Sequence, residues 1–154
     1  MANMRLLADS MLGSLGRWLR LLGYDTAIAR SETDWQIVRR ARAEERIILT
    51  RDRELAQRQG VRTLLVLRDD LDGQLAQTAH DLSLPQPQPG TRCLHCNTPL
   101  QPANRHDVAP DVPSYVLQTQ KNFRRCPVCH RVYWRGTHWL KIEERAARLR
   151  AVTS

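Results

Sequence analysis

No apolar run in this chain approaches the roughly 18 residues of a membrane-spanning helix. Charge at Arg5 also interrupts the N-terminal segment before a signal-like stretch could form. We therefore expect a soluble, cytoplasmic protein with no membrane partner. Residues 1–84 contain no lysine. That absence argues against a phosphoacceptor receiver domain, which would need a lysine to contact its acyl phosphate.

Cysteine is scarce, but its four copies form two Cys-x-x-Cys pairs. Two residues between thiolates let each pair turn back on one cation, and tetrahedral zinc takes four sulfurs at roughly 2.3 Å. Disulfides or a thioredoxin-like redox pair are the alternatives. No signal peptide precedes the cysteines, however, and neither pair lies where a strand enters a helix. The pattern predicts a closed structural zinc site formed by Cys93, Cys96, Cys126 and Cys129.

The spacing of the two cysteine pairs and the chain length limit the number of domains. The 29 residues between Cys96 and Cys126 suit a zinc ribbon with an insertion between its two knuckles. A chain of 154 residues can bury one ordinary core and still carry a small module that depends on its metal to fold. We therefore expect two domains.

Positive charge is concentrated in the cysteine-bearing half. Residues 1–84 carry 13 Lys/Arg and 12 Asp/Glu, a net charge of +1, whereas residues 85–154 carry 11 and 4, a net charge of +7. Cations beside aromatic rings are typical of a nucleic-acid surface. A solvated basic face, or a small ribbon core made of the aromatics, would have the same composition. The residues concerned are Tyr115, Phe123, Tyr133, Trp134 and Trp139, with Arg124, Arg125, Arg131, Arg135 and Lys141.

Strand and helix patterns alternate in the first half of the chain. We expect strands at residues 4–8, 25–29, 46–50 and 61–67, with helices at 11–22, from 34, at 54–58 and at 70–82. This alternation predicts a three-layer α/β domain with a parallel sheet over residues 1–84. Three prolines in residues 85–90 predict an extended linker over 85–92. The zinc ribbon, ending in a basic helix, then occupies residues 93–154.

Five aspartates fall at the carboxyl ends of the predicted strands. Asp9 ends the first strand, Asp34 follows the second, Asp52 lies two residues past the third, and Asp69 and Asp70 follow the fourth. Open α/β folds bind ligands at this edge. Carboxylates gathered there repel one another unless a divalent cation neutralises them, and Mg2+ and Mn2+ favour oxygen ligands. The set predicts a catalytic site that holds one or two such ions.

Helix capping is the alternative explanation for these aspartates. Asp is a favoured N-cap, and each of the five precedes or opens a helix. Ser10 could cap the first helix in place of Asp9. Either Asp69 or Asp70 could be a cap while the other is the ligand, and the sequence does not distinguish them. The case for catalysis therefore depends on the set of aspartates taken together.

The first helix carries two glycines and two arginines, and each pair has two possible explanations. Gly13 and Gly16 would allow a close backbone approach, either to the sheet or to a substrate phosphate. Arg17 and Arg20 lie three residues apart on a polar face. We expect solvated arginines there rather than phosphate contacts.

Several stretches together resemble the Mut-7 C-terminal RNase family. They are residues 8–25 (ADSMLGSLGRWLRLLGYD), residues 47–55 (IILTRDREL), the two Cys-x-x-Cys pairs and residues 133–139 (YWRGTHW). The resemblance covers nearly the whole chain and implies a PIN-like nuclease domain followed by a zinc ribbon. It implies a metal-dependent ribonuclease whose ribbon cysteines match the four found here. The acids of the PIN-like domain match Asp9, Asp34, Asp52 and the pair Asp69 and Asp70.

The chain departs from that pattern at the knuckles. Asn97 and His130 follow the second cysteine of each pair, where glycine is often found. Both residues tolerate left-handed backbone better than most, so we expect the knuckles to form.

These observations favour a ribonuclease that hydrolyses RNA phosphodiester bonds with Mg2+ or Mn2+, while a structural Zn2+ holds an RNA-binding ribbon. The alternative is a noncatalytic RNA- or ribosome-binding protein whose aspartates only cap helices. RNA is the expected partner under both hypotheses. The sequence does not indicate a protein partner.

Overall fold

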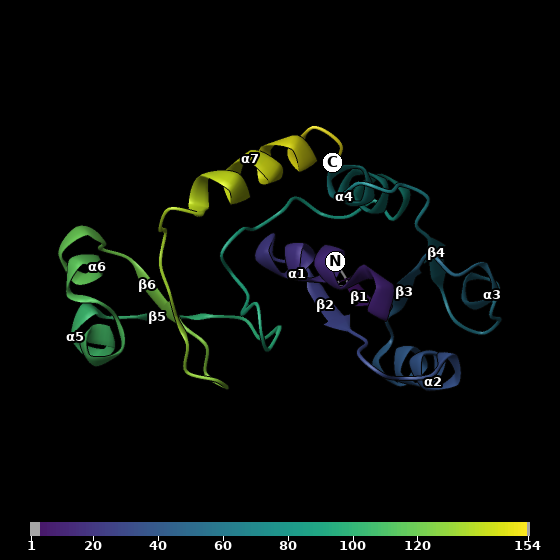
Figure 1. Ribbon diagram of the computed structural model, residues 1–154, viewed down its shortest axis with the longest axis horizontal. Helices are drawn as coiled ribbons and strands as arrows, with labels where there is room; N and C mark the ends of the chain where they lie inside the picture. The colour runs from purple at the N-terminus through teal and green to yellow at the C-terminus, as the bar shows by residue number, and fades with distance from the viewer. Residues whose placement is uncertain (1–3, 154) are drawn as a thin grey trace.

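The computed structural model describes residues 4–153, and residues 1–3 and 154 lie outside this range. The first half is a four-stranded parallel sheet with the order β2-β1-β3-β4 (Figure 1). Its strands are β1 (Arg5–Ala8), β2 (Asp25–Ile28), β3 (Ile47–Thr50) and β4 (Thr63–Leu65). The connecting segments are η1 (Ser10–Leu12), α1 (Gly13–Leu21), α2 (Asp34–Glu44), α3 (Arg53–Ala56) and α4 (Leu71–Asp81).

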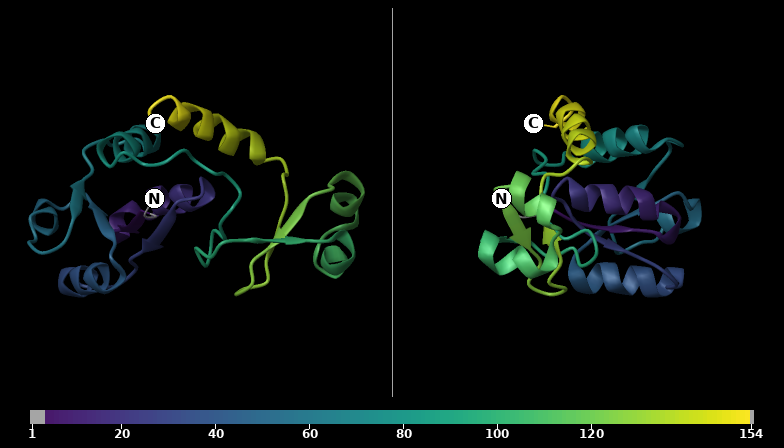
Figure 2. Two further views of the ribbon diagram at one scale, coloured as in Figure 1. Left: turned by 180° about the vertical axis from the view of Figure 1, so that it is seen from behind. Right: turned by 60° about the vertical axis from the view of Figure 1, so that its left-hand side comes forward.

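Helices cover both faces of this sheet. Leu6 of β1 packs in one buried cluster with Leu15 of α1 and Leu75 of α4. The next residue, Leu7, belongs to a separate cluster with Ile37 of α2 on the opposite face. This alternation follows from the two-residue period of a strand. The right-hand view of Figure 2 shows α2 on one side of the sheet and α1 with α4 on the other.

Helix α1 lies unusually close to the sheet at Gly16. A Cβ atom built on Gly16 would lie 2.7 Å from Cγ1 of Ile28 and 3.2 Å from Cβ of Ala8. The absence of a side chain therefore lets the helix pack directly on β1 and β2. Of the two possible reasons for a glycine here, the structure supports close approach to the sheet.

The second half contains a three-stranded antiparallel sheet with the order β5-β6-β7. Its strands are β5 (Gln101–Ala103), β6 (Phe123–Arg125) and β7 (Val132–Tyr133). The insertion between the knuckles folds into α5 (Arg105–Val108), η2 (Ala109–Asp111) and α6 (Ser114–Thr119). Val108, Val116 and Phe123 form a small core beneath these helices. Phe123 is therefore a core residue. A small ribbon core was one of the explanations for the aromatic residues in this half of the chain.

The last helix, α7 (Trp139–Arg150), returns from the ribbon to the first half, as Figure 1 shows. Its buried residues Ala146 and Leu149 join the cluster formed by the sheet, α1 and α4. Arg145 donates a hydrogen bond from Nε to Oδ1 of Asp72 at 2.9 Å, and its guanidinium lies 4.2 Å from the ring centroid of Trp18. The helix thus connects the two halves of the molecule.

The first zinc knuckle docks on edge strand β2. The side chain of Asn97 accepts a hydrogen bond from the Thr26 amide at 2.9 Å and donates one to Asp25 at 2.7 Å. Arg20 donates from Nε to the Thr26 carbonyl at 2.7 Å and from Nη1 to the Leu94 carbonyl at 2.9 Å. The knuckle therefore covers backbone groups that an edge strand would otherwise expose.

An ionic network supports this junction. Burial opposes ionisation of Asp25, but hydrogen bonds from Arg46 and Asn97 outweigh it and hold the pKa of Asp25 below its ordinary value. Arg46 lies 2.8 Å from Asp25 and 2.6 Å from Glu44. The Asp25 carboxylate is therefore ionised at neutral pH and available to orient the Asn97 amide.

The structure confirms the predicted α/β fold, with a parallel sheet and with four cysteines gathered as a zinc ribbon requires. The boundaries at 1–84, 85–92 and 93–154 stay predictions. One expectation was wrong: Arg20 is only 9% exposed, because its guanidinium reaches across to the first knuckle. No helix in residues 4–153 combines the length and apolar character needed to cross a bilayer.

The contact at Gly16 predicts a strong effect of substitution. Gly16→Val should lower the free energy of unfolding by about 1–3 kcal/mol, because the new side chain must displace Ile28 or the helix. Ser14→Val places the same residue on the exposed face of α1 and should change stability by less than about 0.5 kcal/mol. Urea denaturation of both variants measures the difference. Equal stability would show that α1 does not need this close contact.

Candidate functional site

The carboxyl edge of the parallel sheet contains its topological switch point. From the central strand β1 the chain passes to β2 on one side, then returns through α2 to β3 on the other. In open α/β sheets, ligands bind where neighbouring connections leave in opposite directions. Asp9 follows β1, and Asp52 lies two residues after the end of β3. The fold therefore places both aspartates at the same edge of the sheet, after neighbouring strands.

A buried hydroxyl links the two strand ends. Oγ1 of Thr50 donates to Oδ2 of Asp9 at 2.8 Å and accepts a hydrogen bond from the backbone amide of Asp52 at 3.0 Å. Thr50 is 0% exposed. The hydroxyl thus fixes the Asp9 carboxylate relative to the turn that carries Asp52.

Asp9 is a buried carboxylate with no cationic partner among residues 4–153. It is 7% exposed, and its other oxygen accepts a hydrogen bond from the Ser10 amide at 2.7 Å. Buried charges in proteins are usually paired with a cation or coordinate a metal. Hydrogen bonds from an amide and a hydroxyl leave the charge of Asp9 without a counter-ion.

The other aspartates divide between capping and open positions. Asp52 caps α3 through Oδ1, which accepts a hydrogen bond from the Glu54 amide at 2.8 Å. Asp70 caps α4 by accepting from the Gly73 amide at 2.8 Å. That hydrogen bond is the main reason that the pKa of Asp70 is lowered. Asp69 is not the cap, and its 93% exposed side chain pairs with Arg51 at 2.7 Å.

Asp34 is not explained by capping. Thr33 is the N-cap of α2, where it forms a reciprocal capping box with Gln36. Asp34 is the first residue of that helix and makes no hydrogen bond or ion pair from its side chain within the part of the chain that the structure describes. Its carboxylate is therefore free for another role.

The aspartates do not form a tight ligand group in the described chain. Across residues 4–153, the only set of three or more His, Cys, Asp or Glu ligand atoms within 4.8 Å of one another consists of cysteines. Thr50 links the Asp9 carboxylate to the backbone amide of Asp52, whereas Asp34, Asp69 and Asp70 lie on separate segments. Mg2+ needs only one or two carboxylates, because it keeps waters and bridges to substrate phosphate. The chemistry of the Asp9 and Asp52 donors therefore fits such an ion.

The four cysteines form a compact sulfur donor set that fits zinc, with their ligand atoms within 4.8 Å of one another. Sγ of Cys93 lies 3.6 Å from Sγ of Cys129. Zinc–sulfur bonds of about 2.3 Å at tetrahedral angles place sulfurs about 3.8 Å apart. Cys93 and Cys126 are fully buried, and the Tyr133 hydroxyl lies 3.1 Å from Sγ of Cys93. Four thiol donors fill the tetrahedral coordination of zinc, as a structural zinc site requires.

The two knuckles have the same backbone design. Asn97 and His130 adopt left-handed backbone, with φ of 64° and 65°. Their amides donate to the carbonyls of Cys93 and Cys126, each at 2.9 Å. The two non-glycine residues therefore complete both turns, as the sequence predicted.

The close packing of the four thiols shifts the pKa values of two of them in opposite directions. Burial and neighbouring thiols raise the pKa of Cys96 to about 12, whereas a hydrogen bond from the backbone of Arg131 lowers the pKa of Cys129 to about 6. One zinc ion would neutralise the repulsion among the sulfurs and bind all four as thiolates. His95 and His130 are not members of the four-ligand group.

The ribbon and α7 form a basic and aromatic surface beside this metal site. Trp134 and Trp139 line a hollow of about 650 Å3, and the guanidinium of Arg135 lies 4.6 Å from the ring centroid of Trp139. Tyr115 lines the same hollow and is 67% exposed. Arg125, in contrast, pairs with Asp111 at 2.8 Å. The predicted set therefore includes the exposed ring of Tyr115 and the half-buried rings of Trp134 and Trp139, as well as an arginine with a structural partner.

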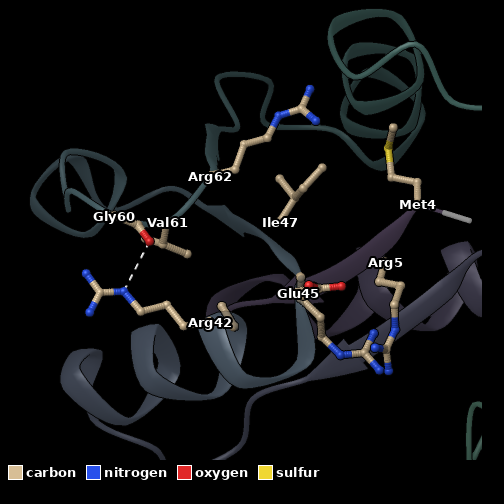
Figure 3. A pocket seen from close by; sticks show the side chains of 10 residues that line it. Met4, Arg5, Arg42, Glu45, Ile47, Gly60, Val61 and Arg62 are labelled. Atoms are coloured by element: carbon tan, nitrogen blue, oxygen red, sulfur yellow. Dashed lines mark hydrogen bonds between the residues drawn. The ribbon is translucent and has the colours of Figure 1, made fainter. Parts of the chain in front are cut away.

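A pocket of about 470 Å3 at the opposite, amino edge of the sheet lacks carboxylates arranged for catalysis (Figure 3). Arg42 donates to the carbonyl of Gly60 at 3.1 Å, as the dashed line shows. Arg5 donates to the Glu44 carbonyl, and Arg46 pairs with Glu44. Because these three arginines already have partners, we assign no role in RNA cleavage to this pocket.

A comparison with protein-family models covers nearly the whole chain. The model of the Mut7-C RNAse domain matches residues 4–146. The chain belongs to the Mut7-C RNAse domain family. Membership indicates a ribonuclease-type function for this Mut7-C domain. No curated protein and no solved structure matches the chain.

Sequence reasoning missed Thr50. A threonine that ends an otherwise aliphatic strand, two residues before Asp52, was the available signal. Its importance depends on the pairing of β3 with β1, which aligns Leu49 with Ala8 and so places Thr50 beside Asp9. The pattern of one strand does not predict its register with another strand.

The zinc assignment predicts a measurable metal content. Purified protein should contain a single zinc ion, and Cys129→Ser should weaken zinc affinity by more than the roughly 10–100-fold that outer-shell changes cost. Val128→Ser places the same side chain at a position that is 62% exposed between the two cysteines, and it should retain zinc. Elemental analysis and chelator competition measure both variants. Full zinc retention by Cys129→Ser would contradict a four-thiolate site.

Proposed function

We propose that this Mut7-C domain is a cytoplasmic, metal-dependent ribonuclease. The observation that carries the proposal is the buried Asp9 carboxylate, held beside the Asp52 turn at the switch point without a cationic partner. A divalent cation would satisfy that charge and is the usual companion of carboxylates in phosphodiester hydrolysis. Four thiols arranged to bind zinc also suit a reducing compartment.

Asp9 and Asp52 would hold Mg2+ or Mn2+, with Asp34 and Asp69 as further acids at the same edge. The bound ion would neutralise phosphate charge and lower the pKa of an attacking water. Thr50 orients Asp9 through its hydroxyl. Asp70 caps α4, which favours a structural role for it within the predicted acidic set.

The ribbon would bind RNA through its basic and aromatic surface. Trp134, Trp139 and Tyr115 offer ring faces to unpaired bases, and Arg135 adds positive charge beside them. The net charge of +7 in residues 85–154 supports attraction to an RNA backbone. A noncatalytic RNA- or ribosome-binding protein is the second candidate, favoured by the capping roles of Asp52 and Asp70.

The test compares RNA cleavage by wild type, Asp9→Asn and Asp52→Asn with Mn2+ added. Both variants should lose at least about 100-fold in rate, because each removes a charge that would bind the ion. Asn is as good an N-cap as Asp, so Asp52→Asn should keep α3 intact. Asp81→Asn removes the same charge from the distal end of α4 and should retain full activity.

Binding of the same RNA is measured alongside cleavage. Lost cleavage with retained binding supports the enzyme. Metal-independent cleavage, or full activity in both variants, would contradict the assigned site. If clean wild-type protein binds RNA but does not cleave it, the noncatalytic alternative is correct.

A further inference from the structure

A hollow of about 320 Å3 lies between the predicted catalytic edge and the first zinc knuckle. Three segments form its walls. Ser10 and Arg17 come from the segment that follows β1, Arg30 from the segment that follows β2, and His95 from the knuckle itself. Since Ser10 directly follows Asp9, the hollow lies next to the turn that carries the aspartate that we assign to catalysis.

Positive charge in this hollow is not neutralised. Arg17 and Arg30 are exposed and make no hydrogen bond or ion pair from their side chains to any residue from 4 to 153. A Cβ on Gly13 would lie 3.4 Å from Nη1 of Arg17, so this guanidinium extends along α1 over Gly13. Arg42 and Arg46, which line the amino-edge pocket, differ because both are engaged with their own chain.

The wall that carries His95 is fixed in place. Arg20, which also lines the hollow, donates from Nη1 to the carbonyls of Leu94 and His95 at 2.9 and 3.3 Å. Asn97 holds the same knuckle against Thr26. His95 also lines a second hollow that includes Arg131 and Trp134. A basic surface therefore continues from the Asp9 edge across the knuckle to the aromatic surface of the ribbon.

We propose that Arg17 and Arg30 form a phosphate subsite that holds the RNA backbone beside the scissile bond. This proposal rests on the proposed ribonuclease function and names the part of the site that positions its substrate. Two guanidinium groups without partners are well suited to bind phosphate oxygens through paired N–H donors. The strand would then pass His95 and reach Trp134, where bases can stack. Arg17 and Arg30 are positioning residues, and the aspartates carry the chemistry.

The test measures binding of a fluorescein-labelled single-stranded oligouridine by anisotropy over a series of salt concentrations, with Ca2+ in place of Mg2+ or Mn2+. Arg17→Gln/Arg30→Gln should weaken binding roughly tenfold. The slope of log affinity against log salt should also fall by about 1, because fewer counterions are released. Arg58→Gln/Arg62→Gln is the matched control. It removes two charges from exposed arginines without side-chain partners within residues 4–153, and Arg62 lines the amino-edge pocket.

A control with wild-type affinity and slope, together with the expected loss in Arg17→Gln/Arg30→Gln, supports the subsite. Wild-type binding by Arg17→Gln/Arg30→Gln would overturn it. Equal losses in both double variants would also overturn it, because they would reflect total charge alone. Circular dichroism of each variant establishes that it is folded. RNA cleavage is scored separately, so an inactive wild type would refute the nuclease while the binding series still decides the subsite.

Discussion

One buried hydroxyl holds the candidate catalytic edge together. Thr50 contacts the Asp9 carboxylate on one side and the Asp52 amide on the other. Its position depends on the parallel pairing of β1 with β3, since the register that pairs Ala8 with Leu49 places the carboxyl ends of the two strands side by side. The consequence is a carboxylate kept out of water without a counter-ion, which a divalent cation would relieve.

The zinc ribbon is a fixed neighbour of this edge. Asn97 and Arg20 bind the first knuckle to edge strand β2. Helix α7 packs on the face of the sheet that α1 and α4 cover. A zinc ion bound by the four cysteines would therefore do more than fold a small module, because the knuckle that it would close also forms one wall of the hollow next to the Asp9 turn. We infer that metal content and substrate positioning depend on each other.

Sequence patterns predicted the strands and helices of the first half within a few residues, because buried aliphatic runs and helical spacing are local signals. The cysteine spacing predicted the metal site for the same reason. The helices inside the insertion at residues 97–125 were missed, since short segments with a small core lack a strong period. The contacts of Thr50, Arg20 and Asn97 also depend on which segments meet in space. A local sequence pattern does not predict such long-range contacts.

The central claim is that Asp9 and Asp52 together bind a divalent cation apart from the zinc site. Electron paramagnetic resonance of Mn2+ added to zinc-loaded protein tests it most directly, with Asp9→Asn and Asp52→Asn compared against Asp81→Asn. The account predicts bound Mn2+ in wild type and Asp81→Asn, and weakened binding in each of the other two variants. Unchanged Mn2+ binding in Asp9→Asn and Asp52→Asn, or no bound Mn2+ in wild type, would contradict it.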